Sequence, residues 1–313
     1  ALRDHGYEVP IAVTGQHREM LDQVNALFGL VPDHDLDVMR HGSSLSGITG
    51  RTLHACTDLL ASERPDAIVV QGDTTSAFAA ALAAFYLNVP VFHLEAGLRT
   101  GDLRSPFPEE GNRRLVGQIA DLHFAPTGRS RENLIREGID PSAVATTGNT
   151  VIDALQRVAS QPSEFAREDL REAFASGRRT LLVTAHRRES WGEPMREAVG
   201  AIAALLDSTP DLQVVLPLHR NPVVREVIEP VLGGRPGVWL TEPLDYSDFC
   251  QAMSLSYLIL TDSGGVQEEA PSLGKPVLVM RDTTERPEGV AAGTTRLVGI
   301  DDATIVSGIF TLL

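Results

Sequence analysis

The chain has 313 residues and a hydrophobic content of 42%, enough for two domains with separate cores, and its mean hydropathy of −0.04 is typical of a globular protein. Its formal net charge of −15 argues against nucleic acid or an anionic membrane as a partner, and no apolar run approaches the ~18 residues of a membrane span. The charged, polar first residues are unlike a signal peptide, and two cysteines, Cys56 and Cys250, make neither a disulfide framework nor a metal cluster, so we expect a cytoplasmic protein.

The first half of the chain alternates between short apolar runs and segments of helical spacing. Such alternation predicts parallel strands connected by helices. We expect strands at residues 10–13, 67–70, 91–94, 122–125 and 144–148, and helices at 18–28, 45–62 and 76–86.

The second half repeats this scheme after a polar stretch at residues 160–171. We therefore place a domain boundary there, with domains at 1–160 and 161–313. We therefore expect an α/β fold, with two Rossmann-like, doubly wound domains that face a cleft. In the second domain we expect strands at 180–183, 212–216, 238–240, 257–260 and 276–280, and a helix at 222–232.

The densest chemistry lies at residues 261–288, TDSGGVQEEAPSLGKPVLVMRDTTERPE. A strand followed by Ser263, Gly264 and Gly265 at the start of a helix suits a phosphate, because free backbone N–H groups and the helix dipole favour an anion there. Glu269 follows in that helix, where a carboxylate suits the hydroxyls of a ribose. A plain turn before a helix would have the same residues, and Arg286 alone could be a solvated loop charge.

Polar side chains that could share one cleft also follow the strands of both halves. Asp73, Glu95 and Glu109 follow strands of the first domain, and clustered acids are candidates for acid and base catalysis. His186 ends a strand of the second domain, beside two arginines. Taken singly, each acid could equally be a helix cap, a turn residue or a surface charge.

Five motifs in order give these residues a more specific meaning. QGDTT, HLEAGLRTGDLRSPFPEEGNR, VTAHRRES, DSGGVQEE and RDTTERPE resemble the signature of the UDP-N-acetylglucosamine 2-epimerase family, of the non-hydrolysing bacterial type. The resemblance spans nearly the whole chain and implies a two-domain, glycosyltransferase-B-like architecture. The family begins with a strand and a Gly-Thr-Arg-Pro-Glu loop that this sequence lacks, so we expect the numbering to describe part of a longer protein.

The resemblance also implies roles for individual residues. Asp73, Glu95, Glu109 and His186 fall on the family's catalytic positions, and two further residues match an effector pocket of some bacterial members, Gln16 and His219. Since Gly42 stands where those members have an arginine, activation by a second substrate molecule is not implied here. The remaining matched positions are expected to bind the substrate: Arg113, Phe249, Ser263, Gly264, Gly265, Glu269 and Arg286.

The reaction implied by the resemblance interconverts UDP-N-acetylglucosamine and UDP-N-acetylmannosamine. UDP leaves as the C2 proton is removed, and UDP then adds back to the glycal after protonation on the other face. Glu95 and Glu109 are the expected acid and base, and Asp73 is expected to assist them. This chemistry requires no cofactor and no metal, and the sequence has neither a GxGxxG motif nor metal-ligand spacing. The expected partners are the UDP-sugar and a second copy of the chain in a homodimer.

Three alternatives remain open at this level. A hydrolysing relative would release N-acetylmannosamine and free UDP. A glycosyltransferase of the glycosyltransferase-B fold would share the nucleotide site and add an acceptor pocket. A binding module without catalysis would bind the nucleotide without turnover.

Overall fold

The computed structural model describes residues 2–15, 18–40, 42–161, 164–185, 192–299 and 302–312. The chain divides into two compact units, Ala1–Asn149 and Thr150–Leu313, here called unit 1 and unit 2. Every strand pair assigned within them is parallel, with helices between successive strands, which confirms the predicted α/β class.

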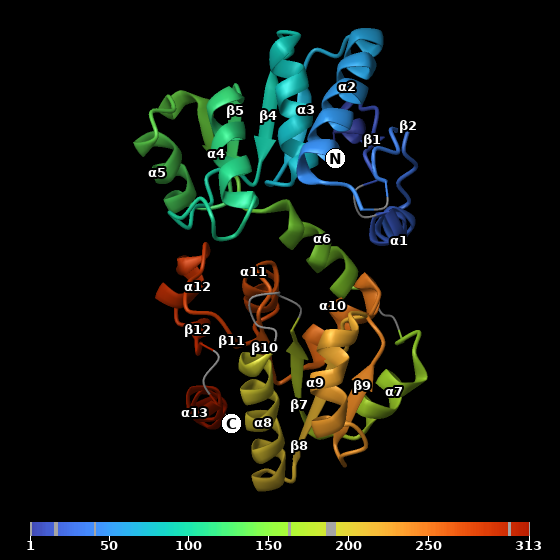
Figure 1. Cartoon of the computed structure of the whole chain (residues 1–313), viewed down its shortest axis with the longest axis vertical. Coiled ribbons are helices and arrows are strands. Elements are labelled where there is room, and N and C mark those ends of the chain that lie inside the picture. Colours follow the sequence, from blue (N-terminus) through green and yellow to red (C-terminus); the bar gives the residue numbers. More distant parts are fainter. Residues whose placement is uncertain are drawn as a thin grey trace. The chain divides into compact units, whose positions relative to one another are not determined.

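Unit 1 is built on a four-stranded parallel sheet in the order β3-β4-β5-β6, and its first two strands pair separately. Helices α2, α3 and α4 lie side by side (Figure 1). The small alanines of α3, fully buried at Ala81, Ala83 and Ala84, let this helix approach the strands closely. The elements are η1 (Arg3–His5), β1 (Ala12–Val13), α1 (Arg18–Phe28), β2 (His34–Asp35), α2 (Leu45–Glu63), β3 (Ile68–Gln71), α3 (Thr75–Tyr86), β4 (Val91–Leu94), α4 (Glu109–Ile119), β5 (Leu122–Ala125), α5 (Gly128–Arg136), η2 (Pro141–Ala143) and β6 (Val144–Thr146).

Unit 2 contains a six-stranded parallel sheet in the order β12-β11-β10-β7-β8-β9. The chain builds outward from β7 to β9 and then returns to add β10 to β12 on the other side, so the strand order reverses between β7 and β10. The elements are α6 (Thr150–Ala159), α7 (Glu168–Ala175), β7 (Arg179–Thr184), α8 (Glu193–Ser208), β8 (Leu212–Pro217), α9 (Pro222–Leu232), β9 (Val238–Thr241), α10 (Tyr246–Leu255), β10 (Leu258–Thr261), α11 (Val266–Ser272), β11 (Val277–Val279), α12 (Pro287–Ala291), β12 (Thr295–Leu297) and α13 (Asp302–Leu312).

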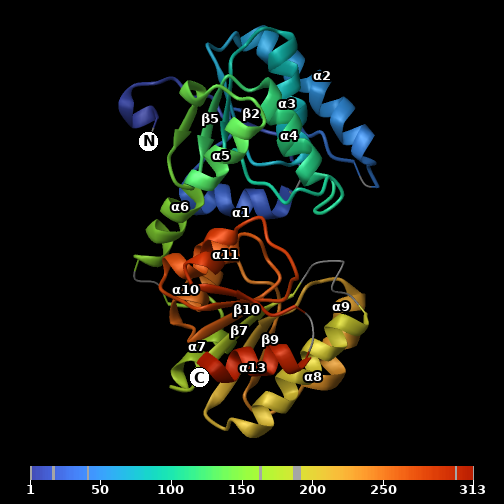
Figure 2. The same ribbon diagram turned by 90° about the vertical axis from the view of Figure 1, so that its left-hand side faces the viewer.

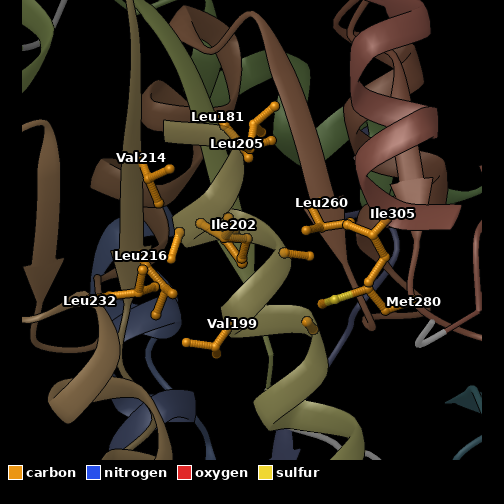
Figure 3. Packing of buried hydrophobic residues seen from close by; sticks show 14 of the residues in the cluster. Leu181, Val199, Ile202, Leu205, Val214, Leu216, Leu232, Leu260, Met280 and Ile305 are labelled. Atoms are coloured by element: carbon orange, nitrogen blue, oxygen red, sulfur yellow. The ribbon is translucent and has the colours of Figure 1, made fainter. Parts of the chain in front are cut away.

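Helices cover both faces of this sheet, with α8 and α9 on one side and α10 and α11 on the other (Figure 2). The main core lies under α8, where Val199, Ile202 and Leu205 point toward strand residues that include Leu216 and Leu260 (Figure 3). All five side chains are at most 3% exposed. Burial of a large aliphatic side chain stabilises a fold by roughly 1.5–3 kcal/mol, so this cluster holds α8 firmly against the strands of the sheet.

Several helices begin at a side-chain cap, which explains where the chain turns from loop to helix. Each capping oxygen accepts a hydrogen bond from a backbone N–H of the first turn, which would otherwise be unpaired. The caps are Ser44 of α2, Thr74 of α3, Thr127 of α5, Asn221 of α9 and Asp245 of α10.

The predicted domain boundary, between residues 160 and 161, lies after α6. The division between the two compact units lies before this helix, between Asn149 and Thr150. Helix α6 packs against α10 and α11, so its contacts belong to unit 2. The polar stretch that we used as a boundary therefore lies within unit 2. Among the described residues, no helix is both long and apolar enough to cross a membrane.

Candidate active site

The candidate carboxylates of unit 1 lie where two neighbouring parallel strands end. Asp73 follows β3 by two residues, and Glu95 comes directly after β4, the strand that pairs with β3. A Cβ atom at Gly72 would lie 3.3 Å from Glu95 Oε2, so the Glu95 carboxylate lies against the turn that carries Asp73. The carboxyl ends of parallel strands share one edge of a sheet, and this edge brings the two acids together.

A charged network holds Asp73 in place. Arg113 donates from Nε and Nη2 to Asp73 Oδ2, at 2.9 and 2.5 Å. The Arg113 side chain is only 6% exposed, and its Nη1 lies 3.3 Å from Glu110 Oε2. Glu110 is fully buried and also accepts from the backbone N–H of Thr100 at 3.1 Å and from Arg114 Nε at 3.1 Å. Because a buried charge is costly unless it is paired, each member depends on its neighbours.

Glu109 lies in the first turn of α4, one residue before Glu110. It is half-buried and stands four residues before Arg113, a spacing that places both side chains on one face of a helix. Since Arg113 contacts Asp73, the face of α4 that carries Glu109 is directed toward the Asp73 turn. Asp73, Glu95, Glu110 and Arg113 thus form a carboxylate cluster of unit 1, and Glu109 stands on the helix face that carries Arg113.

In unit 2, the predicted nucleotide residues lie at the reversal of strand order. The chain leaves β10 at Thr261, passes through Ser263, Gly264 and Gly265, and enters α11. The Thr261 and Thr184 hydroxyls, at the ends of the two central strands, are 2.5 Å apart. In open parallel sheets, ligands bind beyond the carboxyl ends of the strands at such a reversal. The fold therefore gives this tripeptide the position of a ligand-binding turn.

Gly265 has an ordinary helical conformation, with φ −62° and ψ −45°. A Cβ atom at this position would meet Glu269 Oε2 at 3.5 Å, which is normal packing distance. The backbone geometry therefore does not require glycine here. What glycine would provide at this position is room for a ligand to approach the backbone closely, because it has no side chain.

Arg286 is held by two carboxylates. Its Nε donates to Glu268 Oε1 and its Nη1 to Glu285 Oε1, each at 2.5 Å. Glu285 is 5% exposed and also lies 3.1 Å from Arg281 Nη2. Burial alone would raise the pKa of the Glu285 carboxyl, but the charges of Arg286 and Arg281 outweigh it and lower this pKa to about 2. The arginine predicted to contact the nucleotide is thus held in position by ion pairs with Glu268 and Glu285.

Glu269 is buried and faces Tyr246 of α10, whose hydroxyl lies 3.4 Å from Glu269 Oε1. Burial raises the pKa of the Glu269 carboxyl. Phe249 is half-buried on α10, three residues after Tyr246 and on the same face. Phe249 therefore stands on the face of α10 that carries Tyr246, and its predicted place beside the uracil ring stays a prediction.

The structure describes one of the three remaining predicted residues. His219 is exposed beyond the end of β8, where its Nδ1 accepts from the backbone N–H of Asn221 at 3.1 Å. Two predictions, Gln16 and His186, lie outside the described residues. Within the described part of the chain, no group of three or more histidine, cysteine, aspartate and glutamate side chains could hold a metal ion.

Sequence reasoning missed several residues that organise these clusters. Glu110 follows Glu109 at a helix start, where an acidic residue is ordinarily explained by the helix dipole, so only the fold reveals that it is buried. Glu285 lies on a loop outside the described helices, next to Arg286, so no periodicity indicated that it is buried. Asn112, whose side chain donates to the backbone carbonyl of Asp73 at 2.9 Å, lies within the matched motif but was not singled out.

Comparison with known proteins gives a consistent result over the whole chain. Residues 1–313 match the family model described as UDP-N-acetylglucosamine 2-epimerase. The UDP-N-acetylglucosamine 2-epimerase of Escherichia coli K12 is 51% identical over 99% of this chain and 84% of its own length.

Two solved structures extend the comparison to three dimensions. The UDP-GlcNAc 2-epimerase from Neisseria meningitidis, bound to UDP-GlcNAc, is 45% identical with a TM-score of 0.90, and the match covers 99% of this chain and 85% of the other. The Methanocaldococcus jannaschii enzyme in complex with UDP-GlcNAc and UDP is 33% identical with a TM-score of 0.84, covering 100% of this chain and 87% of the other. These matches confirm the family and the fold class expected from the motifs.

Proposed function

Since the chain belongs to the UDP-N-acetylglucosamine 2-epimerase family, we propose that it interconverts UDP-N-acetylglucosamine and UDP-N-acetylmannosamine. The observation that carries this proposal is the match of the family over the whole chain, with half of the residues identical to the Escherichia coli enzyme. The carboxylate cluster of unit 1 and the turn at the strand reversal of unit 2 supply the groups that the reaction needs.

The chemical difficulty is the C2 proton of the sugar, which is barely acidic. As the bond between C1 and the UDP oxygen breaks, positive charge develops at C1 and the C2 proton becomes removable. Elimination gives UDP and a glycal. Protonation of C2 on the opposite face and return of UDP to C1 give the epimer, so atoms and charge balance without any redox step.

Glu95 and Glu109 are the proposed acid and base. Asp73 is held at one oxygen by two hydrogen bonds from Arg113, so its remaining role is to position and polarise its neighbours. Glu95 receives a weak contact from Asn149 Nδ2, at 3.4 Å to Oε1, and Glu109 is half-buried at the helix start. A positioned proton donor or acceptor contributes roughly 10²–10⁴-fold to rate.

Unit 2 supplies the proposed UDP site. Backbone N–H groups of the turn at Ser263, Gly264 and Gly265, together with Arg286, would stabilise the diphosphate as it leaves. Glu269 would hold the ribose hydroxyls, and Phe249 would lie against the uracil ring. His186 is proposed to assist the leaving diphosphate, as its match to the family motif implies.

Product analysis tests this proposal directly. Incubation with UDP-N-acetylglucosamine, followed by phosphorus NMR and anion-exchange chromatography, should show the mannosamine nucleotide appearing while free UDP stays at trace level. Free UDP released in equal amount with sugar would instead identify the hydrolysing reaction. UDP binding without any product would contradict the enzyme assignment and favour a binding module, and turnover only with an added sugar acceptor would favour a glycosyltransferase.

We also infer that the protein is a cytoplasmic homodimer. Both cysteines are free and buried, which fits a reducing compartment. Sedimentation equilibrium of the purified protein should give twice the mass of a single chain. A monomer mass at micromolar protein would contradict the dimer, and recovery in a membrane or secreted fraction would contradict the compartment.

A further inference from the structure

His93 is a buried histidine directly beneath the carboxylate cluster of unit 1. It lies in β4, two residues before Glu95, and is 1% exposed. Its Nε2 lies 2.8 Å from the carbonyl oxygen of Gly72. Since a carbonyl can only accept, the Nε2 nitrogen must carry the proton and donate it to Gly72.

Strand β4 thus fixes both polar backbone groups of Gly72. The Gly72 N–H donates to the carbonyl of Leu94 at 3.0 Å, and the Gly72 carbonyl accepts from the His93 ring. The next carbonyl, that of Asp73, accepts from Asn112 at 2.9 Å. The peptide units on both sides of the Asp73 side chain are therefore held in position by neighbouring elements.

The same turn also defines the place of Glu95. Gly72 has φ +71°, and Glu95 has φ +61°, a left-handed conformation that is uncommon for a residue with a side chain. Such a conformation persists when its surroundings enforce it, and it clusters at functional sites. Because a Cβ atom at Gly72 would lie 3.3 Å from Glu95 Oε2, any displacement of the Gly72 peptide also changes the space of the Glu95 carboxylate.

The His93 ring has the character of a fixed neutral donor. Burial, partly offset by the hydrogen bond to Gly72, lowers the pKa of His93 to about 4. His123 of β5 packs edge-on against the ring, with centroids 6.4 Å apart, and holds it in place. The ring therefore carries one N–H toward Gly72 throughout the neutral pH range.

We propose that His93 is a positioning residue for the epimerisation. Through its hydrogen bond to the Gly72 carbonyl, it sets the separation and orientation of Asp73 and Glu95, without itself touching the substrate. This inference rests on the proposed function of the cluster. Displacement of a catalytic group by about 1 Å can cost roughly 10²-fold in rate, so the bond is expected to act on kcat.

Two polar substitutions that differ in reach test the inference. In His93→Gln the side-chain amide can place an N–H donor where Nε2 lies, whereas in His93→Asn the amide is one methylene shorter and stops near the Nδ1 position. His93→Leu removes the donor altogether. For each variant, kcat, KM, UDP affinity and the thermal unfolding midpoint are measured, with wild type as the reference for epimerase activity.

The expected result is a roughly 10²-fold fall in kcat for His93→Asn and His93→Leu, recovery of most of that loss in His93→Gln, and KM and UDP affinity within a few-fold of wild type. Equal kcat for the glutamine and asparagine variants, or kcat that simply follows the unfolding midpoint, would overturn it. If His93→Leu does not fold, the comparison of kcat between His93→Gln and His93→Asn still tests the inference. A wild type without epimerase activity would instead refute the proposed function and remove the basis of this inference.

Discussion

Replacement of Glu285 by glutamine tests whether the cluster around Arg286 is held together by charge. Glu285 is 5% exposed and lies between two arginines, with Arg286 Nη1 at 2.5 Å and Arg281 Nη2 at 3.1 Å. Glutamine keeps the shape of the side chain and removes its charge. The folded protein would then contain two guanidinium groups that have lost a shared carboxylate.

The magnitude follows from the pKa of the Glu285 carboxyl. That pKa lies at about 2 in the folded protein against a usual value of 4.5. At 1.36 kcal/mol for each pKa unit, this difference corresponds to about 3 kcal/mol of folding free energy. Because the folded pKa is the lower one, the contribution is complete above pH 4.5 and is lost as the pH falls toward 2.

Urea unfolding at pH 6, 5, 4 and 3 measures this contribution. We expect Glu285→Gln to have a lower free energy of unfolding than wild type at pH 6. This difference in free energy should become smaller by about 2 kcal/mol at pH 3. Glu226→Gln, which changes an exposed carboxylate on α9, is the matched control and should keep a constant difference. If the difference in free energy of unfolding between Glu285→Gln and wild type stays the same at every pH, the ionised Glu285 carboxylate does not stabilise the fold through its charge.

Two further predictions concern unit 1. Arg113→Met should lower the free energy of unfolding by roughly 1.5–3 kcal/mol in urea titrations, because it removes the cation that pairs with Asp73 and one of the two arginines that pair with the fully buried Glu110; a loss below 1 kcal/mol would contradict the network. Gly97→Ala should cost more than Gly101→Ala, although both glycines have φ near +90°, because a Cβ atom at Gly97 would lie 2.2 Å from the Ser130 carbonyl oxygen, while Gly101 has no atom within 4 Å. Left-handed strain alone costs about 1–2 kcal/mol, so equal losses in thermal unfolding would show that the clash is relieved.

Local patterns predicted the elements of the fold well where the apolar runs were long or bounded by clear caps. The strands at 91–94 and 122–125 and the helix at 222–232 have the predicted bounds, since their ends coincide with abrupt changes from apolar to polar residues. The three-residue strand β12 was not predicted, because it is too short to show periodicity and exists through pairing with β11.

Some residues of the candidate site could be predicted from the sequence, and others could not. Asp73 and Glu95 could be selected because they follow strands in recognisable motifs. The role of Glu110 could not, since adjacent acids at a helix start give no indication of which one is buried. Likewise, the hydrogen bond of His93 to Gly72 depends on the register between β3 and β4, which the sequence alone does not state.

The carboxylates of unit 1 are proposed to exchange the C2 proton of a UDP-sugar. Proton NMR in deuterated water, with UDP-N-acetylglucosamine and wild type, Glu95→Gln or Glu109→Gln, tests this proposal. We predict deuterium at C2 of both nucleotide sugars with wild type, and exchange slowed by roughly 10²–10⁴-fold in each variant while UDP still binds. Formation of the mannosamine nucleotide with hydrogen retained at C2, or undiminished exchange in both variants, would contradict proton exchange by these carboxylates.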